Sequence, residues 1–319
     1  MNSLELKKAD RVEVLTLMDN YADVLLENTD VVTRRPVLAE GRIHADTLVA
    51  EHGLSLLVTV YSGGQGHTIL FDTGYSSIGV PHNMAQLGVD LGQIEAVVLS
   101  HGHMDHTGAL YELLDKLPKG IPLVVHPDAL RFPRYLEMPD GTKVQFPKKL
   151  DGDAIDERGV TLVESKGPSL IADETVMITG EIDRATTFEK GMPNALMEQD
   201  GKLVQDPISD DQALVINLGE QGLVIIAGCA HAGIINTVMF AGKITGIQKV
   251  HAVLGGFHLS GPTFEPALEE TIIELKKMAP EIIVPMHCTG WKAIKRFSEE
   301  FRTSFILNAV GSKFTLSSV

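Results

Sequence analysis

The sequence predicts an α/β fold, and three observations favour this class. An apolar run at 96–99 is followed by a helical pattern over 106–117 and a second apolar run at 121–126, the spacing of a βαβ unit. Several later apolar runs end in glycine and histidine, as strands do at the edge of an open α/β sheet. Hydrophobic residues make up 44% and charged residues 22% of the 319 residues, values typical of a globular protein with a substantial core.

Composition excludes several classes of partner. The net charge of −15 argues against nucleic acid, since phosphate contacts need clustered Lys and Arg. No apolar run approaches the roughly 18 residues that cross a bilayer, and the polar start of the chain lacks the apolar core of a signal peptide.

Cys229 and Cys288 each lie close to a histidine, which favours reduced thiols near a metal site over a disulfide. We expect a cytoplasmic protein with a small-molecule substrate; the oligomeric state is left open.

The first elements along the chain are strands. Residues 11–18 alternate polar and apolar side chains, which predicts a half-buried strand. The mixed segment 28–46 has the pattern of a loop. Strands are then expected at 56–61 and 67–71, joined by a glycine-rich hairpin turn.

The region 127–211 is irregular and rich in proline. Five basic side chains gather in its first part, namely Arg131, Arg134, Lys143, Lys148 and Lys149. They could receive a phosphate or carboxylate of a substrate, or they could form a solvated surface loop. We interpret 127–211 as an insertion that covers the site, within a single domain spanning 1–319, and expect it to encode substrate choice.

Regular structure resumes after the insertion. The expected strands are 212–218, 223–227, 252–254 and 282–284, the expected helices are 265–278 and 291–301, and two short strands follow near 305–307 and 313–316.

Four potential metal ligands lie within six residues, in the segment His101-Gly102-His103-Met104-Asp105-His106 between a strand and a helix. His101 and His103 are two residues apart, so on an extended backbone both imidazoles can approach one ion. Asp105 and His106 could serve a second ion beside the first. Imidazole and carboxylate ligands suit zinc, iron or manganese. A solvated polar loop is the alternative, and it explains so dense a pattern poorly.

Three later histidines stand where an apolar run ends and glycines begin. They are His231, His258 and His287, and strand ends of this kind meet at one edge of a sheet. Taken with the first motif, this predicts His231 and His287 as ligands. We expect His258 and His52 to lie in the pocket, where His258 could donate a hydrogen bond to the substrate.

The segment 101–106 resembles the signature of the metallo-β-lactamase superfamily. The resemblance implies a four-layer αβ/βα sandwich around one or two metal ions. It also implies that Asp72, at the end of a strand, supports the metal-binding loop as a hydrogen-bond acceptor. From the residue alone, a cap on the turn at 72–74 is equally consistent.

The chain departs from the commonest pattern of that superfamily. Between Thr107 and Ala230 the only histidine is His126, at the end of a strand, and no aspartate follows Ala227 where members usually carry a bridging one. Cys229 lies in that neighbourhood. Either Cys229 is a thiolate ligand, as in some members, or His231 takes this place and a second ion is held more weakly.

A narrower resemblance covers the chain from residue 19 to residue 290. The matching stretches resemble a subgroup that includes the archaeal dihydropterin-methyl-ribofuranosylaminobenzene phosphate synthase, a dihydropteroate-synthase-like enzyme. They are 19–20, 50–55, 72–74, 101–108, 228–231, 255–259 and 287–290.

Metal-dependent hydrolysis of a small anionic substrate that bears a phosphate or carboxylate group is the chemistry that these residues favour. One or two zinc ions, or else iron or manganese, would lower the pKa of bound water from about 16 toward 7. The ligands would be His101, His103, Asp105, His106, His231 and His287, with Cys229 as the further candidate. Asp105 could orient the resulting hydroxide and accept its proton, while His258 contacts the leaving group.

Two other functions are consistent with the same residues. A transferase could join a pterin-methyl diphosphate to an aminobenzene ribotide, with an amine in place of water and with Arg131 or Arg134 holding phosphate. A di-iron redox protein or a non-catalytic sensor would use the same ligands, and its visible absorption would distinguish it from a colourless zinc protein.

Overall fold

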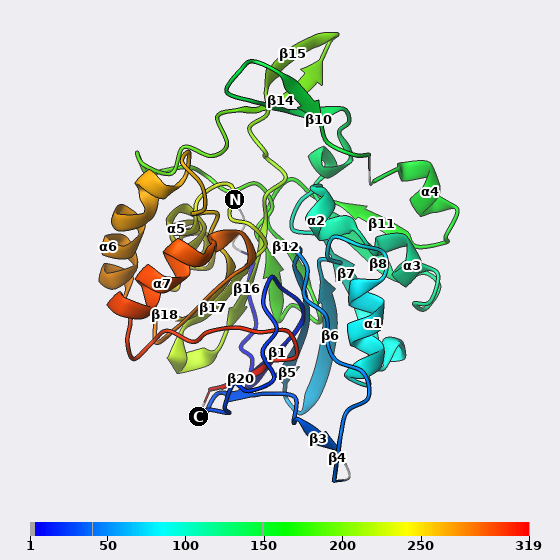
Figure 1. Cartoon of the computed structure of the whole chain (residues 1–319), viewed down its shortest axis with the longest axis vertical. Helices are drawn as coiled ribbons and strands as arrows, with labels where there is room; N and C mark the ends of the chain where they lie inside the picture. The colour runs from blue at the N-terminus through cyan, green and yellow to red at the C-terminus, as the bar shows by residue number, and fades with distance from the viewer. Residues whose placement is uncertain (1–3, 40, 149, 319) are drawn as a thin grey trace.

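Two β-sheets pack face to face, and helices cover their outer faces (Figure 1). Residues 4–39, 41–148 and 150–318 are described by a computed structural model; Lys149 lies outside them. The order of layers is helices, sheet, sheet, helices, so the predicted α/β class and the four-layer αβ/βα sandwich are confirmed. No helix of the described residues is long and apolar enough to cross a membrane.

The first sheet has eight strands in the order β11-β8-β7-β6-β5-β1-β20-β2. Its strands β6, β7, β8 and β11 run parallel, so their carboxyl ends lie at one edge. The bounds are β1 Arg11–Met18, β2 Val32–Thr33, β5 Ser55–Ser62, β6 Gln65–Phe71, β7 Ile94–Val98, β8 Pro122–Val125, β11 Thr161–Glu164 and β20 Lys313–Ser317. Helices α1 (Gly79–Gln86) and α3 (Leu110–Leu114) bury apolar side chains against its outer face.

The second sheet has six strands in the order β12-β13-β16-β17-β18-β19, and β17, β18 and β19 are parallel. The bounds are β12 Ser169–Ile171, β13 Val176–Ile178, β16 Ala213–Asn217, β17 Leu223–Ala227, β18 Val250–Gly256 and β19 Ile282–Met286. Three helices cover its outer face, namely α5 Ile234–Thr245, α6 Leu268–Met278 and α7 Trp291–Glu300.

The main core lies between the two sheets. Val14 and Val58 of the first sheet and Ile216 and Leu254 of the second belong to one buried apolar cluster. Strand β1 buries every second side chain along its first five residues, as its alternating sequence predicts. Strands β16 and β17 are buried at every position, which is typical of strands that are covered on both faces.

The region 127–211 is more regular than the sequence predicts. It contributes β11 to the first sheet and β12 and β13 to the second, and it forms a separate four-stranded sheet in the order β10-β9-β14-β15 at the top of Figure 1. The bounds of these strands are β9 Arg134–Glu137, β10 Lys143–Gln145, β14 Ala195–Gln199 and β15 Lys202–Gln205, with helix α4 at Gly152–Asp156. Strands of three to five residues between prolines are too short to give a readable period.

Three smaller differences concern single elements. No strand forms at 305–307, where Phe305 makes only an isolated bridge to Ile283. The helix predicted over 106–117 is two short helices, α2 (Met104–Thr107) and α3, and the loop predicted over 28–46 contains β2 and the hairpin of β3 (Leu38–Ala39) and β4 (Arg42–Ile43).

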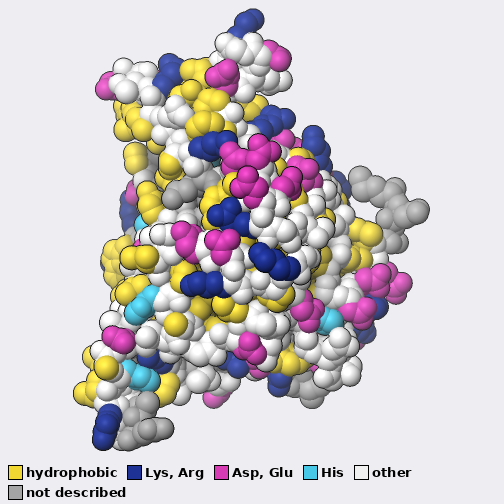
Figure 2. All heavy atoms as spheres, turned by 90° about the vertical axis from the view of Figure 1, so that its right-hand side faces the viewer, with side chains coloured by type: hydrophobic (Ala, Val, Ile, Leu, Met, Phe, Trp, Pro, Cys, Tyr) yellow, Lys and Arg dark blue, Asp and Glu magenta, His cyan; other side chains and the backbone are white. Residues whose placement is uncertain are grey.

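Figure 2 shows acidic and basic side chains interspersed on the face beside α1, α3 and α4.

Candidate metal centre

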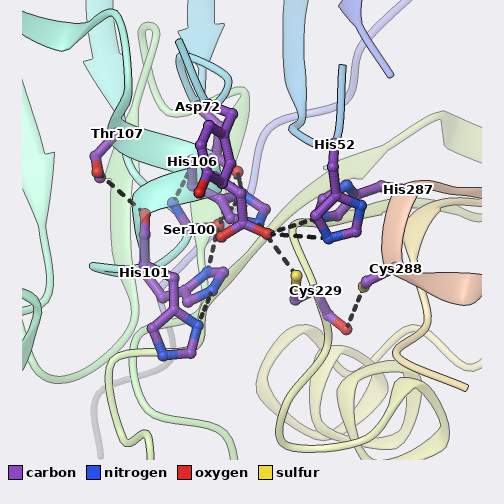
Figure 3. Close-up of polar contacts among 12 residues, drawn as sticks. His52, Asp72, Ser100, His101, His106, Thr107, Cys229, His287 and Cys288 are labelled. Atoms are coloured by element: carbon purple, nitrogen blue, oxygen red, sulfur yellow. Dashed lines mark hydrogen bonds and ion pairs between the residues drawn. The ribbon is translucent and has the colours of Figure 1, made fainter. Parts of the chain in front are cut away.

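The predicted ligands meet at one edge of the two sheets, at the carboxyl ends of parallel strands (Figure 3). His101 and His103 follow β7, and His106 lies in α2. His231 follows β17 and His287 follows β19, both in the second sheet. The structure therefore brings together residues that are nearly two hundred positions apart.

Asp72, directly after β6, supports the loop that carries the first histidines. One carboxylate oxygen accepts the N–H of Ser100 at 2.7 Å, and the other accepts the Ser100 hydroxyl at 2.7 Å and lies 2.6 Å from Nδ1 of His106. All three residues are fully buried. This arrangement leaves Nε2 of His106 free to face the cluster, the role that the superfamily resemblance implies for Asp72.

His101, His103 and His231 form one group of imidazoles. Nε2 of His101 lies 3.0 Å from Nδ1 of His103 and 3.2 Å from Nε2 of His231. Phe146 stacks on the outer face of His103, with ring centroids 5.1 Å apart. The histidine of the 107–230 interval, His126, instead accepts the N–H of Asp128 at 3.1 Å.

Asp105, His106 and His287 form a second group. Oδ2 of Asp105 lies 3.2 Å from Nε2 of His287 and 3.9 Å from Nε2 of His106. The sulfur of Cys229 lies 3.1 Å from the same nitrogen of His106. The donor atoms of these four residues all lie within 4.8 Å of one another.

Cys229 lies between the two groups. Its sulfur is also within 4.8 Å of the donor atoms of His101 and His231, and it forms a third set of this size with His258 and Cys288. The thiol of Cys288 donates to the carbonyl oxygen of Cys229 at 3.6 Å. His258 therefore lies beside the cluster, in contact with His231 at 4.4 Å between ring centroids.

The donor set fits a metal ion. Within the described ranges, buried ring nitrogens of His103, His231, His258 and His287 have no well-aligned hydrogen-bond partner. Burying unpaired imidazole nitrogens is unfavourable, and Nε2 of His287 faces the carboxylate of Asp105 within a set that also includes His106 and Cys229, which indicates a cation site. Imidazole, carboxylate and thiolate together are a donor set that zinc accepts.

The protonation states favour metal binding by the first group. Burial, followed by the neighbouring His106, keeps the pKa of His101 well below its ordinary value, and burial with nearby imidazoles does the same for His231. Burial lowers the pKa of His103 to about 4. Burial opposes the charged form of His106 too, but Asp72 and Asp105 raise its pKa to about 9. Neutral imidazole is the ligand form, so His101, His103 and His231 need lose no proton at neutral pH.

The two arginines predicted to hold substrate phosphate have different environments. Arg134 is buried, and its guanidinium donates to both oxygens of Asp210, at 2.7 and 3.1 Å. Asp210 in turn accepts the N–H of Gly102 at 2.8 Å, so Arg134 supports the 101–106 loop instead of presenting free donors to a substrate. Arg131 is 45% exposed and pairs with Asp128 at 2.9 Å. Together with His103 and Lys148 it lines a narrow cavity.

A larger cavity of about 450 Å³ opens beside the cluster. His231 and His258 line it, and the ring of Phe264 is perpendicular to that of His258, with centroids 4.2 Å apart. Glu189 and Lys190 also line this cavity. The carboxylate of Glu189 accepts the N–H groups of Ile235 and Asn236 at the start of α5.

Sequence reasoning missed several side chains that support the site. Ser100 and Asp210 hold the 101–106 loop, and Asn20 hydrogen-bonds to the rings of His52 and His287. Asn20 belongs to the stretch 19–20 that carries the narrower resemblance, whereas Ser100 lies directly before the 101–106 segment and has no pattern of its own. No motif in the sequence singles out Asp210.

Three comparisons with known proteins agree with this geometry. A sequence profile of the metallo-β-lactamase superfamily matches residues 50–176. The chain is 33% identical to the 7,8-dihydropterin-6-methyl-4-(β-D-ribofuranosyl)-aminobenzene-5′-phosphate synthase of Methanocaldococcus jannaschii, over 95% of this chain and 96% of that protein. It is also 33% identical to an uncharacterized protein of that organism, over 82% of this chain and 92% of the relative.

A solved structure shares the fold. The crystal structure of Tm1679, a metal-dependent hydrolase of the β-lactamase superfamily, aligns with a TM-score of 0.72 at 24% sequence identity, over 96% of this chain and 99% of that chain. At this identity the likeness concerns the architecture.

Proposed function

Because the chain belongs to the metallo-β-lactamase superfamily, we propose that it is a metal-dependent hydrolase of a small substrate that carries a phosphate or carboxylate group. The observation that carries the proposal is the convergence of the 101–106 loop with His231 and His287 from the other sheet. The cavity beside His231 and His258 is of the size that holds a small molecule.

We assign the ligands to two sets. His101, His103 and His231 would hold one ion, and Asp105, His106 and His287 a second, with Cys229 available to both. A bound divalent cation supplies Lewis acidity at a scissile carbonyl or phosphoryl group and lowers the pKa of a coordinated water. We propose zinc, with iron or manganese as the alternatives.

The chain's own residues would position the substrate and move protons. Asp105 faces the cluster as a carboxylate, since His106 and His287 lower its pKa although burial opposes this, and it could accept a proton from an attacking water. His258 lines the cavity, and we propose that it contacts the leaving group. Phe264 and Pro266 would exclude water from that part of the cavity.

Substitution of one ligand tests the proposal. His103→Ala should lower bound metal and abolish hydrolysis, with the fold retained by circular dichroism. The measurements are elemental analysis and turnover of a panel of phosphodiesters, lactones and thioesters, including bis(p-nitrophenyl) phosphate. A matched control is His82→Gln, because His82 lies on α1 and contacts the carbonyl of Thr47. Full activity of a metal-free variant would contradict the proposal.

Group transfer is a second candidate, supported by the 33% identity to a synthase over nearly the whole chain. In this case the ions would stabilise a pyrophosphate leaving group, and an aromatic amine would replace water as the nucleophile. Incubation of the protein with a pterin-methyl diphosphate and an aminobenzene ribotide separates the two functions. A joined product supports transfer, while release of the pterin alcohol alone supports hydrolysis.

A further inference from the structure

The side chain of Asn20 bridges two histidines at the edge of the site. Its Nδ2 lies 3.1 Å from the carbonyl oxygen of His287 and 3.1 Å from Nδ1 of His52. Its Oδ1 lies 3.2 Å from Nδ1 of His287. The neighbouring Asp19 is buried, accepts the N–H of His287 at 2.8 Å and accepts the amide of Asn308 at 2.6 Å. The loop after β1 is therefore held firmly against the end of β19.

These contacts determine which terminal atom of the Asn20 side chain is the amide nitrogen and which is the oxygen. A backbone carbonyl oxygen can only accept, so the Asn20 atom facing His287 O must be the NH₂ group. The second hydrogen of this group then points at Nδ1 of His52, and Oδ1 is the acceptor that faces Nδ1 of His287. One amide thus offers a donor to one imidazole and an acceptor to the other.

The two neutral rings must consequently adopt opposite tautomers. His287 carries its hydrogen on Nδ1 and leaves a lone pair on Nε2, the atom that lies 3.2 Å from Oδ2 of Asp105. His52 has a bare Nδ1 and carries its hydrogen on Nε2, which lies 3.8 Å from the same oxygen. The two rings are side by side, with centroids 4.8 Å apart (Figure 3).

We propose that Asn20 is a positioning residue that sets a different tautomer, and therefore a different role, for each of these two histidines. His287 offers a lone pair to a cation, whereas His52 offers an N–H to an oxygen of the substrate or of the transition state. The exposure of His52 supports this, since 63% of its side chain is accessible at the mouth of the site, while that of His287 is fully buried. The inference rests on the proposed metal-dependent function and adds His52 as a hydrogen-bond donor in the reaction.

The tautomers can be observed directly. The full chain, labelled with ¹⁵N-histidine and loaded with ¹¹³Cd²⁺, is measured by long-range ¹H–¹⁵N correlation. We expect Nε2 of His287 to couple to ¹¹³Cd, and His52 to carry its hydrogen on Nε2 without coupling to the metal. A hydrogen on Nδ1 of His52, or cadmium coupling to His52, would overturn the inference.

Variants separate the two roles. His52→Ala should keep its metal content and lose roughly 10²-fold in kcat toward bis(p-nitrophenyl) phosphate, the effect of removing one preorganised donor. His52→Gln retains an N–H₂ group and should recover part of this loss. Asn20→Ala should lower metal affinity roughly 10- to 100-fold, as loss of a partner of a ligating histidine does, and should leave the His52 ring as a mixture of tautomers.

The outcomes distinguish this inference from the proposed function. Wild-type protein that binds no metal would overturn both. Metal binding and hydrolysis with an unchanged rate in His52→Ala would overturn the inference alone, as would equal metal affinity in Asn20→Ala and wild type. His82→Gln serves again as the surface control.

Discussion

Asp72 accepts three hydrogen bonds from a loop that follows a different strand, and this explains how a short turn can hold several imidazoles in place. The Ser100 N–H, the Ser100 hydroxyl and the His106 ring all donate to one buried carboxylate. Resemblance to the superfamily predicted the role of Asp72. The part of Ser100 was not predicted, because a serine between a strand and a histidine carries no distinctive pattern.

Replacing this carboxylate should weaken metal binding. In Asp72→Asn an NH₂ group must face one of three donors, so the His106 ring loses its fixed orientation. We expect roughly 10- to 100-fold lower affinity for zinc, measured by competition with a chromophoric chelator. Asp115→Asn is the matched control, since the Asp115 side chain is 57% exposed, and it should bind zinc as the wild type does. Equal affinities in all three proteins would contradict the role of Asp72.

Arg134 shows why side-chain pairing resists prediction at this scale. In the sequence it belongs to a basic cluster, and a phosphate-binding role follows naturally. In the structure the acidic residues that neutralise it, Asp206 and Asp210, come from more than seventy positions away. Local charge patterns do not contain this information.

Among the elements, the break between α2 and α3 shows how the 101–106 loop is attached to its neighbours. The Gly108 N–H donates to the Gly74 carbonyl at 2.7 Å, and the Thr73 N–H donates to the His106 carbonyl at 2.7 Å. An added Cβ at Gly108 would lie 1.9 Å from the carbonyl oxygen of Tyr75. The two loops approach so closely that only glycine fits, which ends the helix that periodicity alone predicts to be continuous.

Gly108→Ala should therefore be strongly destabilising. The added methyl group meets backbone atoms that cannot rotate away, so we expect a loss of roughly 3 kcal/mol in the free energy of unfolding, measured in urea. Gly152→Ala, at the start of α4, is the control, because an added Cβ there meets nothing within 4 Å. It should change stability by less than about 1 kcal/mol. Similar losses in both variants would show that the close approach is not the cause.

The start of α5 gives the protein a dependence on pH. Burial raises the pKa of Glu189 from an ordinary value of 4.5 to about 7, although the N–H groups of Ile235 and Asn236 favour its charged form. Folding thus favours the protonated carboxyl. Its contribution to stability is fully present below pH 4.5 and is lost as the pH rises toward 7.

Urea unfolding between pH 5 and pH 8 tests this linkage. The stability of the wild type relative to Glu189→Gln should fall as the pH rises, by up to roughly 1.4 kcal/mol per pH unit. Glutamine keeps the shape but does not ionise. Glu112→Gln, at an exposed position of α3, should follow the wild type at every pH. Parallel curves for wild type and Glu189→Gln would contradict a raised pKa.

At the scale of the whole molecule, the strongest sequence signal was that ligands follow strands. Parallel strands place their carboxyl ends at one edge, so His231 and His287 could be expected near the 101–106 loop without knowledge of the strand order. The strand order itself was not predictable. Strand β20 lies between β1 and β2, and β11 from the irregular region joins the first sheet, because long-range pairing depends on the shared core.

Because the candidate ligands come from both sheets, a bound cation should tie the two halves of the sandwich together. Chelation should lower the melting temperature by roughly 5 °C when the metal had been present at about a hundred times its Kd. His103→Ala should show a smaller change on chelation. A melting temperature unaffected by chelator in metal-loaded wild type would indicate that the cation does not bridge the sheets.

The contact between Asp19 and Asn308 joins segments that are 289 positions apart in the sequence. Asp19 holds the backbone of His287 while Asn308 orients Asp19, and Asn308 stands just before the final strand β20. These residues come from segments far apart in the sequence, so the contact forms only after both ends of the first sheet have come together. We therefore expect the backbone of His287 to reach its final position late in folding, after the long-range pairing of the strands.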